Sequence, residues 1–120
     1  VDKYWFFCNF ANLDNGLKLK ICKKLNYSII EYDYKFCKYR SIEKHKMIEN
    51  KDCNCTEDMV GKINLAFYGY AKKTWFMSEK QRNIFLNKIR TIKKENTVIL
   101  SSIFRIGDLR FIDSIRDRLR

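Results

Sequence analysis

The chain has 120 residues, of which 46% are hydrophobic and 32% charged, and its 25 Lys and Arg against 14 Asp and Glu give a net charge of +11. With Pro absent and only four Gly, this composition excludes a disordered chain and collagen-like or Pro-rich sequences. The length suits one domain with a buried core, and every apolar run is far shorter than the about 18 residues that a membrane span requires.

The first third of the chain contains one clear strand and one ambiguous segment. Tyr4–Ala11 is apolar and aromatic, which predicts a buried strand. Strict alternation over Leu17–Ile21, directly after Asn15-Gly16, predicts an antiparallel hairpin. Leu and Ile residues at four-residue steps over Leu13–Leu25 predict a helix instead. The β-branched and aromatic segment Tyr27–Phe36 predicts a second strand.

The middle of the chain, residues 37–69, is mostly polar. We expect it to be an insertion or excursion within a single domain of residues 1–120. A short helix is expected at Ser41–Glu49, and a strand at Ile63–Tyr70.

The last third of the chain has the clearest helix pattern. Ser78–Lys94 has an apolar stripe and begins with a capping box at Ser78. Thr97–Leu100 reads as a short buried strand, and Leu109–Leu119 as a last helix. The residues of this last helix that are expected to face inward are Phe111, Ile112, Ile115 and Leu119.

Helices and strands that follow one another in this way favour an α/β fold, with a small central sheet of three or four strands flanked by helices. The hairpin interpretation of Leu17–Ile21 leads to an alternative, an α+β fold with an N-terminal antiparallel hairpin.

The positive charge is clustered along the chain. Leu17–Lys51 has ten basic and four acidic residues, and Tyr70–Glu95 has eight and two. Such clustering favours a basic surface for nucleic acid or another polyanion, in an intracellular protein of the cytoplasm, nucleoid or nucleus. A homo-oligomer or a protein partner is the other expectation. The residues expected to bind nucleic acid are Lys72, Lys73, Lys80, Arg90, Lys94 and Arg105.

The five cysteines have an irregular spacing, which makes a poor disulfide framework. Three of them, Cys37, Cys53 and Cys55, lie with His45 in one Lys-rich stretch, and three Cys with one His can bind zinc as a tetrahedron. The Cys-x-Cys step is tighter than the usual ligand spacing. We therefore expect reduced thiols and no cofactor, with these four residues as the alternative, a zinc site.

His45 is the single histidine, and it limits the catalytic chemistry. It lies between two lysines and would be the general base of a ribonuclease-type site, with Arg105 as a second candidate residue. A solvated, non-catalytic histidine is the more common outcome, so we expect no catalytic residues, with these two as the alternative.

The segment Lys93–Asp108, with the sequence KKENTVILSSIFRIGD, resembles a stretch of the serine recombinases, the resolvase/invertase family. In that family a helix end and a buried strand precede a turn that carries catalytic arginines. Phe7–Ala11 resembles the end of the family's first strand, and Leu17–Glu31 resembles its first helix and second strand. The resemblance implies that the ambiguous segment is helical.

The catalytic residues of that family are mostly missing here. Ala11 stands where the resemblance places the nucleophilic Ser, and Asn9 where it places an Arg. Arg105 matches one arginine of the turn, but Asp108 replaces the next. Without a nucleophile the chain cannot form a covalent link to DNA.

The sequence therefore predicts a non-catalytic nucleic-acid-binding domain that resembles a degenerate serine recombinase. One alternative is a small basic ribonuclease toxin that uses His45. The other is a viral or plasmid accessory module for protein interaction.

Overall fold

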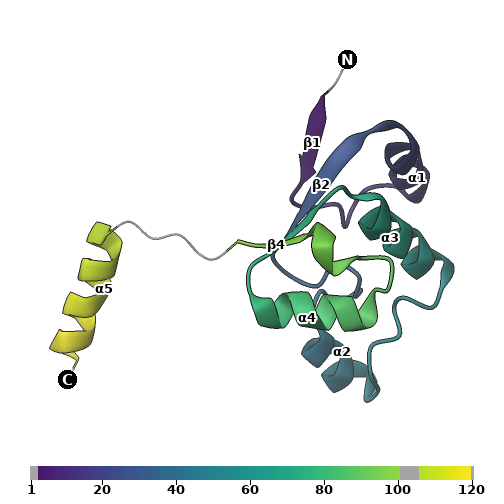
Figure 1. The fold of residues 1–120 in the computed structure, drawn as a ribbon. Helices are drawn as coiled ribbons and strands as arrows, with labels where there is room; N and C mark the ends of the chain where they lie inside the picture. The colour runs from purple at the N-terminus through teal and green to yellow at the C-terminus, as the bar shows by residue number, and fades with distance from the viewer. Residues whose placement is uncertain (1–2, 101–105, 120) are drawn as a thin grey trace.

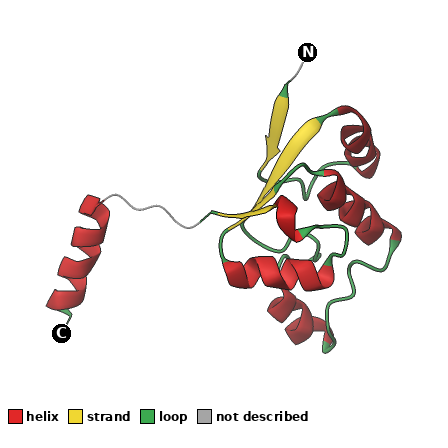
Figure 2. Cartoon of the chain, viewed as in Figure 1, coloured by secondary structure: helices red, strands yellow, loops and turns green. Residues whose placement is uncertain are grey.

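A computed structural model describes residues 3–100 and 106–119 of the chain. It is an α/β fold with a four-stranded parallel sheet and five helices (Figures 1 and 2). The elements of the described residues are, in order, β1 (Tyr4–Phe7), α1 (Asn15–Lys24), β2 (Asn26–Glu31), α2 (Ile42–Glu49), α3 (Met59–Tyr70), β3 (Thr74–Phe76), α4 (Glu79–Lys88), the 3-10 turn η1 (Lys94–Asn96), β4 (Thr97–Ile99) and α5 (Ile106–Arg118).

The four strands are neighbours in chain order, β1-β2-β3-β4, and every pair is parallel. A parallel pair cannot be joined by a tight hairpin, because the chain must return to the same edge of the sheet before the next strand begins. The segment between β1 and β2 is therefore helix α1, and the hairpin prediction is wrong. Asp14 begins this helix, since its Oδ2 accepts a hydrogen bond from the backbone N–H of Leu17 at 3.1 Å.

One face of the sheet carries the core. The register puts Phe7, Ile29 and Thr74 side by side on this face. From α3, Phe67 stacks on Tyr27 with ring centroids 4.9 Å apart. From α4, the ring of Phe85 contacts the ring of Phe76, with centroids 4.9 Å apart. The core is thus largely a set of aromatic contacts between the sheet and one layer of helices.

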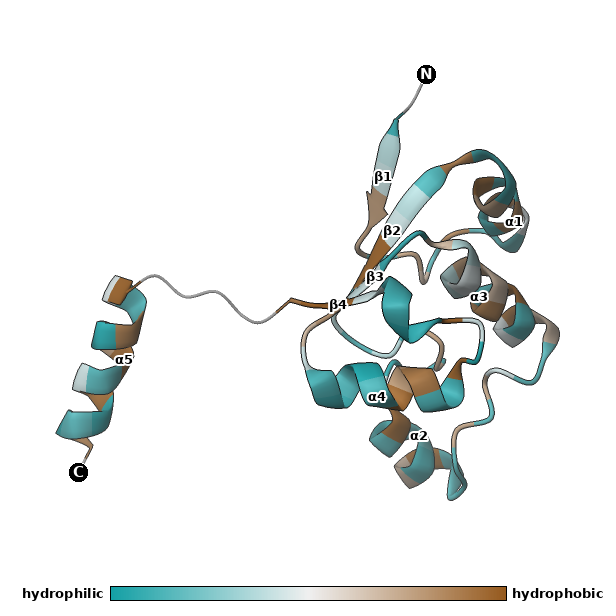
Figure 3. Cartoon of the chain, in the orientation of Figure 1, coloured by the Kyte–Doolittle hydropathy of each residue, from teal (hydrophilic) through white to brown (hydrophobic). Residues whose placement is uncertain are grey.

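The opposite face of the sheet is also apolar. Tyr4 and Phe6 lie on it and are 49% and 55% exposed, while Ile30, Trp75 and Val98 are half-buried. In Figure 3, β4 and parts of β1 and β2 are brown, while the remaining parts of β1 and β2 are pale teal. Helices α1, α3 and α4 all pack on the core face of the sheet. The fold therefore has two layers, one sheet and one layer of helices, rather than three.

Two of the predicted elements differ clearly from the structure, and a third is confirmed. The strand prediction for Ile63–Tyr70 is wrong, because these residues belong to α3, which Asp58 caps through a 2.7 Å hydrogen bond from the N–H of Gly61. Helix α4 ends at Lys88, before the predicted end at Lys94, because the backbone of Ile89 is extended, with φ −119° and ψ 95°. The short helix expected at Ser41–Glu49 is confirmed as α2.

Helix α5 stands apart from the α/β body in Figure 1. The prediction that its apolar residues face inward is wrong, because they are between 38% and 83% exposed. Those residues are Phe111, Ile112, Ile115 and Leu119. Within the described residues, every helix is too short or too polar to cross a lipid bilayer.

Candidate metal centre and basic surface

Four ligand side chains converge beyond the carboxyl end of β2. Cys37 comes from the β2–α2 connection, His45 from α2, and Cys53 and Cys55 from the α2–α3 connection. Their three sulfur atoms and one imidazole nitrogen all lie within 4.8 Å of one another, and three of the four residues are buried. These are the residues of the alternative zinc site, and the fold brings all of them together.

The spacing of these atoms is close to that of a tetrahedral zinc site. The Nδ1 atom of His45 lies 3.5 Å from the Sγ of Cys37 and 3.5 Å from the Sγ of Cys55. Zinc bonds of about 2.3 Å to sulfur and about 2.0 Å to nitrogen would hold S and N about 3.6 Å apart at the tetrahedral angle. The donor set therefore fits zinc in both chemistry and size.

Local sequence builds this arrangement. The chain turns at Cys37–Arg40, where the N–H of Arg40 donates to the carbonyl of Cys37 at 2.8 Å and Arg40 has a φ of 57°. Ser41 then caps α2 by accepting a hydrogen bond from the N–H of Lys44 at 3.1 Å. This cap places His45 on the first turn of α2, where its ring lies next to the turn that contains Cys37.

The other ring nitrogen of His45 faces a carboxylate. Nε2 lies 3.2 Å from Oε2 of Glu49, one helical turn later, although the N–H is not aligned well enough for a full hydrogen bond. Glu49 also accepts a hydrogen bond from the hydroxyl of Tyr39 at 3.0 Å and pairs with Lys38. The hydrogen bond from Lys38 is the main reason that the pKa of Glu49 falls to about 2. A carboxylate in this place orients a histidine ligand and fixes its tautomer.

The sulfur atoms lie in an environment that disfavours uncompensated charge. Burial is the largest cause that raises the pKa of the Cys53 thiol to about 12, and the neighbouring thiol of Cys37 adds to it. On the far side, the backbone N–H of Lys38 points to the Sγ of Cys55 at 3.5 Å. A divalent cation at the centre of the cluster would reverse this preference and favour thiolates.

The imidazole of His45 does not face solvent. The residue is 0% exposed, and its Nδ1 is directed at two sulfur atoms. A general base must reach the proton of a substrate. The geometry thus favours the ligand role of His45 over the catalytic one, and the second catalytic candidate, Arg105, lies outside the described residues.

The basic residues expected to bind nucleic acid are exposed but do not share one helix face. Lys72 and Lys73 precede β3, and Lys94 precedes β4, whose first residue Thr97 pairs with Thr74. These residues and Arg90 therefore gather at the amino-terminal edge of the sheet. Lys80, in the first turn of α4, lies at the opposite end of that helix. None of these five cations forms an ion pair with another described residue.

The sequence did not predict the burial of three charged residues, Lys18, Glu31 and Lys35. Lys18 is 3% exposed although Leu17 beside it is 44% exposed, so the buried face of α1 is rotated from the predicted one. Glu31 and Lys35 form a buried ion pair of 2.8 Å. A lysine next to a leucine carries no signal of its own burial. For the ion pair, the only sequence signal is that an acidic and a basic residue, Glu31 and Lys35, stand four positions apart.

Comparison with protein-family models, with curated proteins and with solved structures finds no match to this chain.

Proposed function

We propose that this chain is a zinc-binding α/β domain in which zinc has a structural role. The observation that carries the proposal is the convergence of Cys37, His45, Cys53 and Cys55, with all four ligand atoms within 4.8 Å. Four protein ligands fill a tetrahedral zinc site and leave no position for water or substrate, which is the pattern of structural rather than catalytic zinc.

The role of the metal follows from what it would connect. The ligands come from the two connections that flank α2 and from α2 itself. Helix α2 has eight residues, and His45 is its one buried residue. So short a helix is not stable on its own, so zinc bonds would supply much of the free energy that holds this segment against the sheet.

The test is metal content. Chain purified with zinc should hold one zinc per molecule by elemental analysis, and Cys53→Ser should lose it. The matched control is Cys8→Ser, because Cys8 is an exposed thiol outside the cluster. A strong chelator should lower the thermal midpoint of the parent but not of Cys53→Ser. Zinc retained by Cys53→Ser, or a parent that binds no added zinc, would contradict the proposal.

A second function, non-catalytic binding of nucleic acid, is supported by the exposed cations at the amino-terminal edge of the sheet. Lys72, Lys73, Arg90 and Lys94 are exposed and form no ion pair with described residues. Cations that no carboxylate neutralises are available to phosphates, and each phosphate contact releases condensed counterions. Binding should therefore weaken as salt rises, for all sequences alike.

The experiment compares two variants that lose the same charge. One carries Lys→Gln or Arg→Gln at Lys72, Lys73, Arg90 and Lys94. The control carries Lys→Gln at the exposed residues Lys20, Lys44 and Lys62 and Arg→Gln at the exposed Arg110, none of which lies next to the start of a strand. Affinity for single- and double-stranded DNA and RNA is measured across a salt series. We expect the first variant to bind at least about tenfold more weakly with a flatter salt slope. Equal loss of affinity in both variants would show that binding depends on net charge alone and not on this surface.

A further inference from the structure

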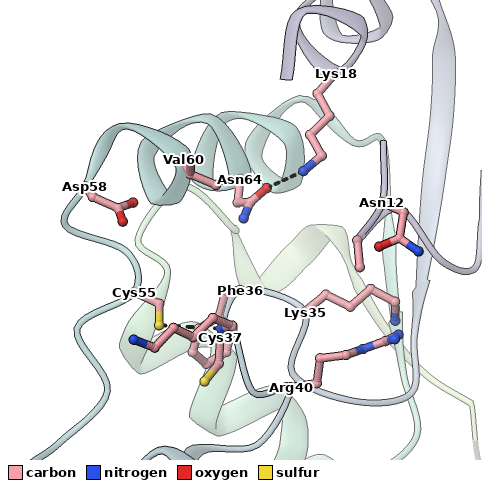
Figure 4. Close-up of a pocket in the computed structure, with 12 residues that line it drawn as sticks. Asn12, Lys18, Lys35, Phe36, Cys37, Arg40, Cys55, Asp58, Val60 and Asn64 are labelled. Carbon is pink, nitrogen blue, oxygen red and sulfur yellow. Dashed lines mark hydrogen bonds between the residues drawn. The ribbon is translucent and has the colours of Figure 1, made fainter. Parts of the chain in front are cut away.

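The geometry points to a binding site for the phosphate group of a small phosphate ester, in a cavity of about 310 Å³ beside the metal centre. The cavity is lined by the β1–α1, β2–α2 and α2–α3 connections and by the amino-terminal halves of α1 and α3 (Figure 4). The carboxyl ends of the parallel strands β1 and β2 lead into it, and open α/β sheets bind ligands at this edge.

Lys18 is the residue that a ligand would complete. It is 3% exposed, and its ammonium group donates a 2.9 Å hydrogen bond to Oδ1 of Asn64, a neutral partner (Figure 4). No described carboxylate lies within ion-pair distance of it. Burial lowers the pKa of this ammonium group, and the more distant charge of Asp14 only partly opposes that effect. A buried ammonium without a counter-ion is costly, and a bound anion removes the cost.

The other cations that line the cavity have carboxylates of their own. Lys35 lies 2.8 Å from Glu31 and 2.9 Å from Asp33, and the Nε of Arg40 lies 2.7 Å from Asp33. Two cations thus share these two carboxylates, and Lys18 adds a third cation to the lining that no described carboxylate pairs. The balance at this side of the cavity is positive.

Two acidic features of the lining must also be counted. Asp58 lines the cavity, but its Oδ1 accepts the 2.7 Å hydrogen bond from Gly61 that caps α3. The thiols of Cys37 and Cys55 form another part of the wall, together with Lys38, which pairs with Glu49. The phosphate position is therefore at the Lys18 end of the cavity, away from Asp58 and the sulfur atoms.

The donors at that end match a phosphoryl group. Lys18 offers an ammonium group, Asn12 and Asn64 offer side-chain amides, and Arg40 offers guanidinium N–H groups, one of which contacts Asn9 at 3.4 Å. These groups present several N–H donors around one anion, which is the arrangement that binds phosphate oxygens. The cavity is much larger than one phosphate group, so the ligand is an ester whose organic part occupies the remaining volume.

The experiment measures binding of inorganic phosphate, adenosine monophosphate and adenosine to the zinc-loaded chain by calorimetry. The informative variant is Lys18→Met, which keeps the length of the side chain and removes its charge. Lys20→Met is the matched control, because Lys20 is exposed on the same helix. We expect inorganic phosphate and adenosine monophosphate to bind both the parent and the Lys20→Met control. Their affinity should be at least tenfold lower in Lys18→Met and largely restored in Lys18→Arg. Adenosine alone should bind far more weakly than its monophosphate.

The outcomes separate this site from the functions proposed above. Zinc content and circular dichroism of Lys18→Met should equal those of the parent, which shows that the metal centre and the fold are intact. The variant with neutralised Lys72, Lys73, Arg90 and Lys94 should keep its affinity for phosphate. Equal phosphate affinity in Lys18→Met and the parent, or no phosphate binding by the parent, would overturn the inference and leave the zinc proposal standing.

Discussion

Glu31 ends β2 with a fully buried carboxyl group. It pairs with Lys35 at 2.8 Å, accepts a hydrogen bond from the hydroxyl of Tyr68, and accepts another from the N–H of Asp33 at 3.2 Å. Despite these partners, burial is the dominant effect and raises the pKa of the carboxyl from 4.5 to about 7. A well-connected group can still prefer its neutral form when water is excluded from it.

This carboxyl gives stability a definite dependence on pH. Between pH 4.5 and about 7 the native state holds a proton that the unfolded chain has already released. Stability therefore falls as pH rises through this window, by about 3 kcal/mol for the Glu31 contribution. We expect the wild type to lose this amount relative to Glu31→Gln, in urea unfolding at saturating zinc between pH 4.5 and about 8.

The comparison uses the difference between the two proteins because acid also protonates the zinc ligands, which acts in the opposite direction. That effect is common to both chains and cancels in the difference. Parallel stability profiles for wild type and Glu31→Gln would show that Glu31 is ionised throughout the range.

Single residues were the hardest features to predict. The chemistry of the four candidate zinc ligands is visible in the sequence, but their irregular spacing favours free thiols, and only the fold shows that the ligand atoms meet. The burial of Lys18 depends on how α1 is rotated against α3, where it meets Asn64. Rotation of a helix is set by tertiary packing and not by its own sequence.

At the scale of elements, the first turn of α3 packs tightly against the loop of the candidate metal centre that contains Cys55 and Thr56. A Cβ atom on Gly61 would lie 2.7 Å from the Cα of Thr56 and would also overlap the carbonyl oxygen of Cys55. Both neighbours are backbone atoms, which cannot move aside as a flexible side chain does. The glycine is thus required by close approach between the first turn of α3 and the loop that holds Cys55.

We expect Gly61→Ala to destabilise the chain by about 1–3 kcal/mol and to weaken zinc binding, because the loop must shift away from α3. The measurements are the thermal midpoint and the rate of zinc loss to a chelator. Gly107→Ala is the control, because a Cβ there meets nothing within 4 Å and a helix gains about 0.5–1 kcal/mol from the change. Equal behaviour of the two variants would contradict the tight contact seen at Gly61.

The predictions of single elements were wrong where a local pattern fits both a strand and a helix. Asn15-Gly16 is a strong hairpin signal, yet it forms the first turn of α1 because β1 and β2 pair in parallel. Ile63–Tyr70 is apolar on most sides and was read as a strand. It is helical because Phe67 and Tyr68 both contact core side chains while Gly69 approaches Thr91. Short apolar runs do not separate buried helix from buried strand.

At the scale of the whole molecule, the fold class was predictable and is confirmed. Alternating helices and strands led to an α/β fold with a small central sheet, and the structure has four parallel strands. The layer arrangement was not predictable, because the sequence does not say on which face a helix will pack. The resemblance to serine recombinases and the nucleic-acid function remain predictions.

Two apolar surfaces remain exposed on the described chain. One is the face of the sheet that carries Tyr4 and Phe6, and the other is the stripe of α5 that includes Phe111 and Ile112. Together they exceed the scattered apolar residues that are normal on a monomer surface. They explain why pattern reading placed these residues in a core, since nothing in their periodicity differs from that of a buried face.

The four residues of the candidate metal centre are close together in the chain as well as in space. All four lie between Cys37 and Cys55, whereas the sheet must bring Tyr4 beside Asn26 and Thr74 beside Thr97. Short loops close sooner than long ones, so contacts of low sequence separation form first. During synthesis the Cys37–Cys55 segment leaves the ribosome before β3 and β4 exist. We therefore expect metal to bind the nascent chain early, and the order of folding to run outward from the zinc loop to the strands on either side.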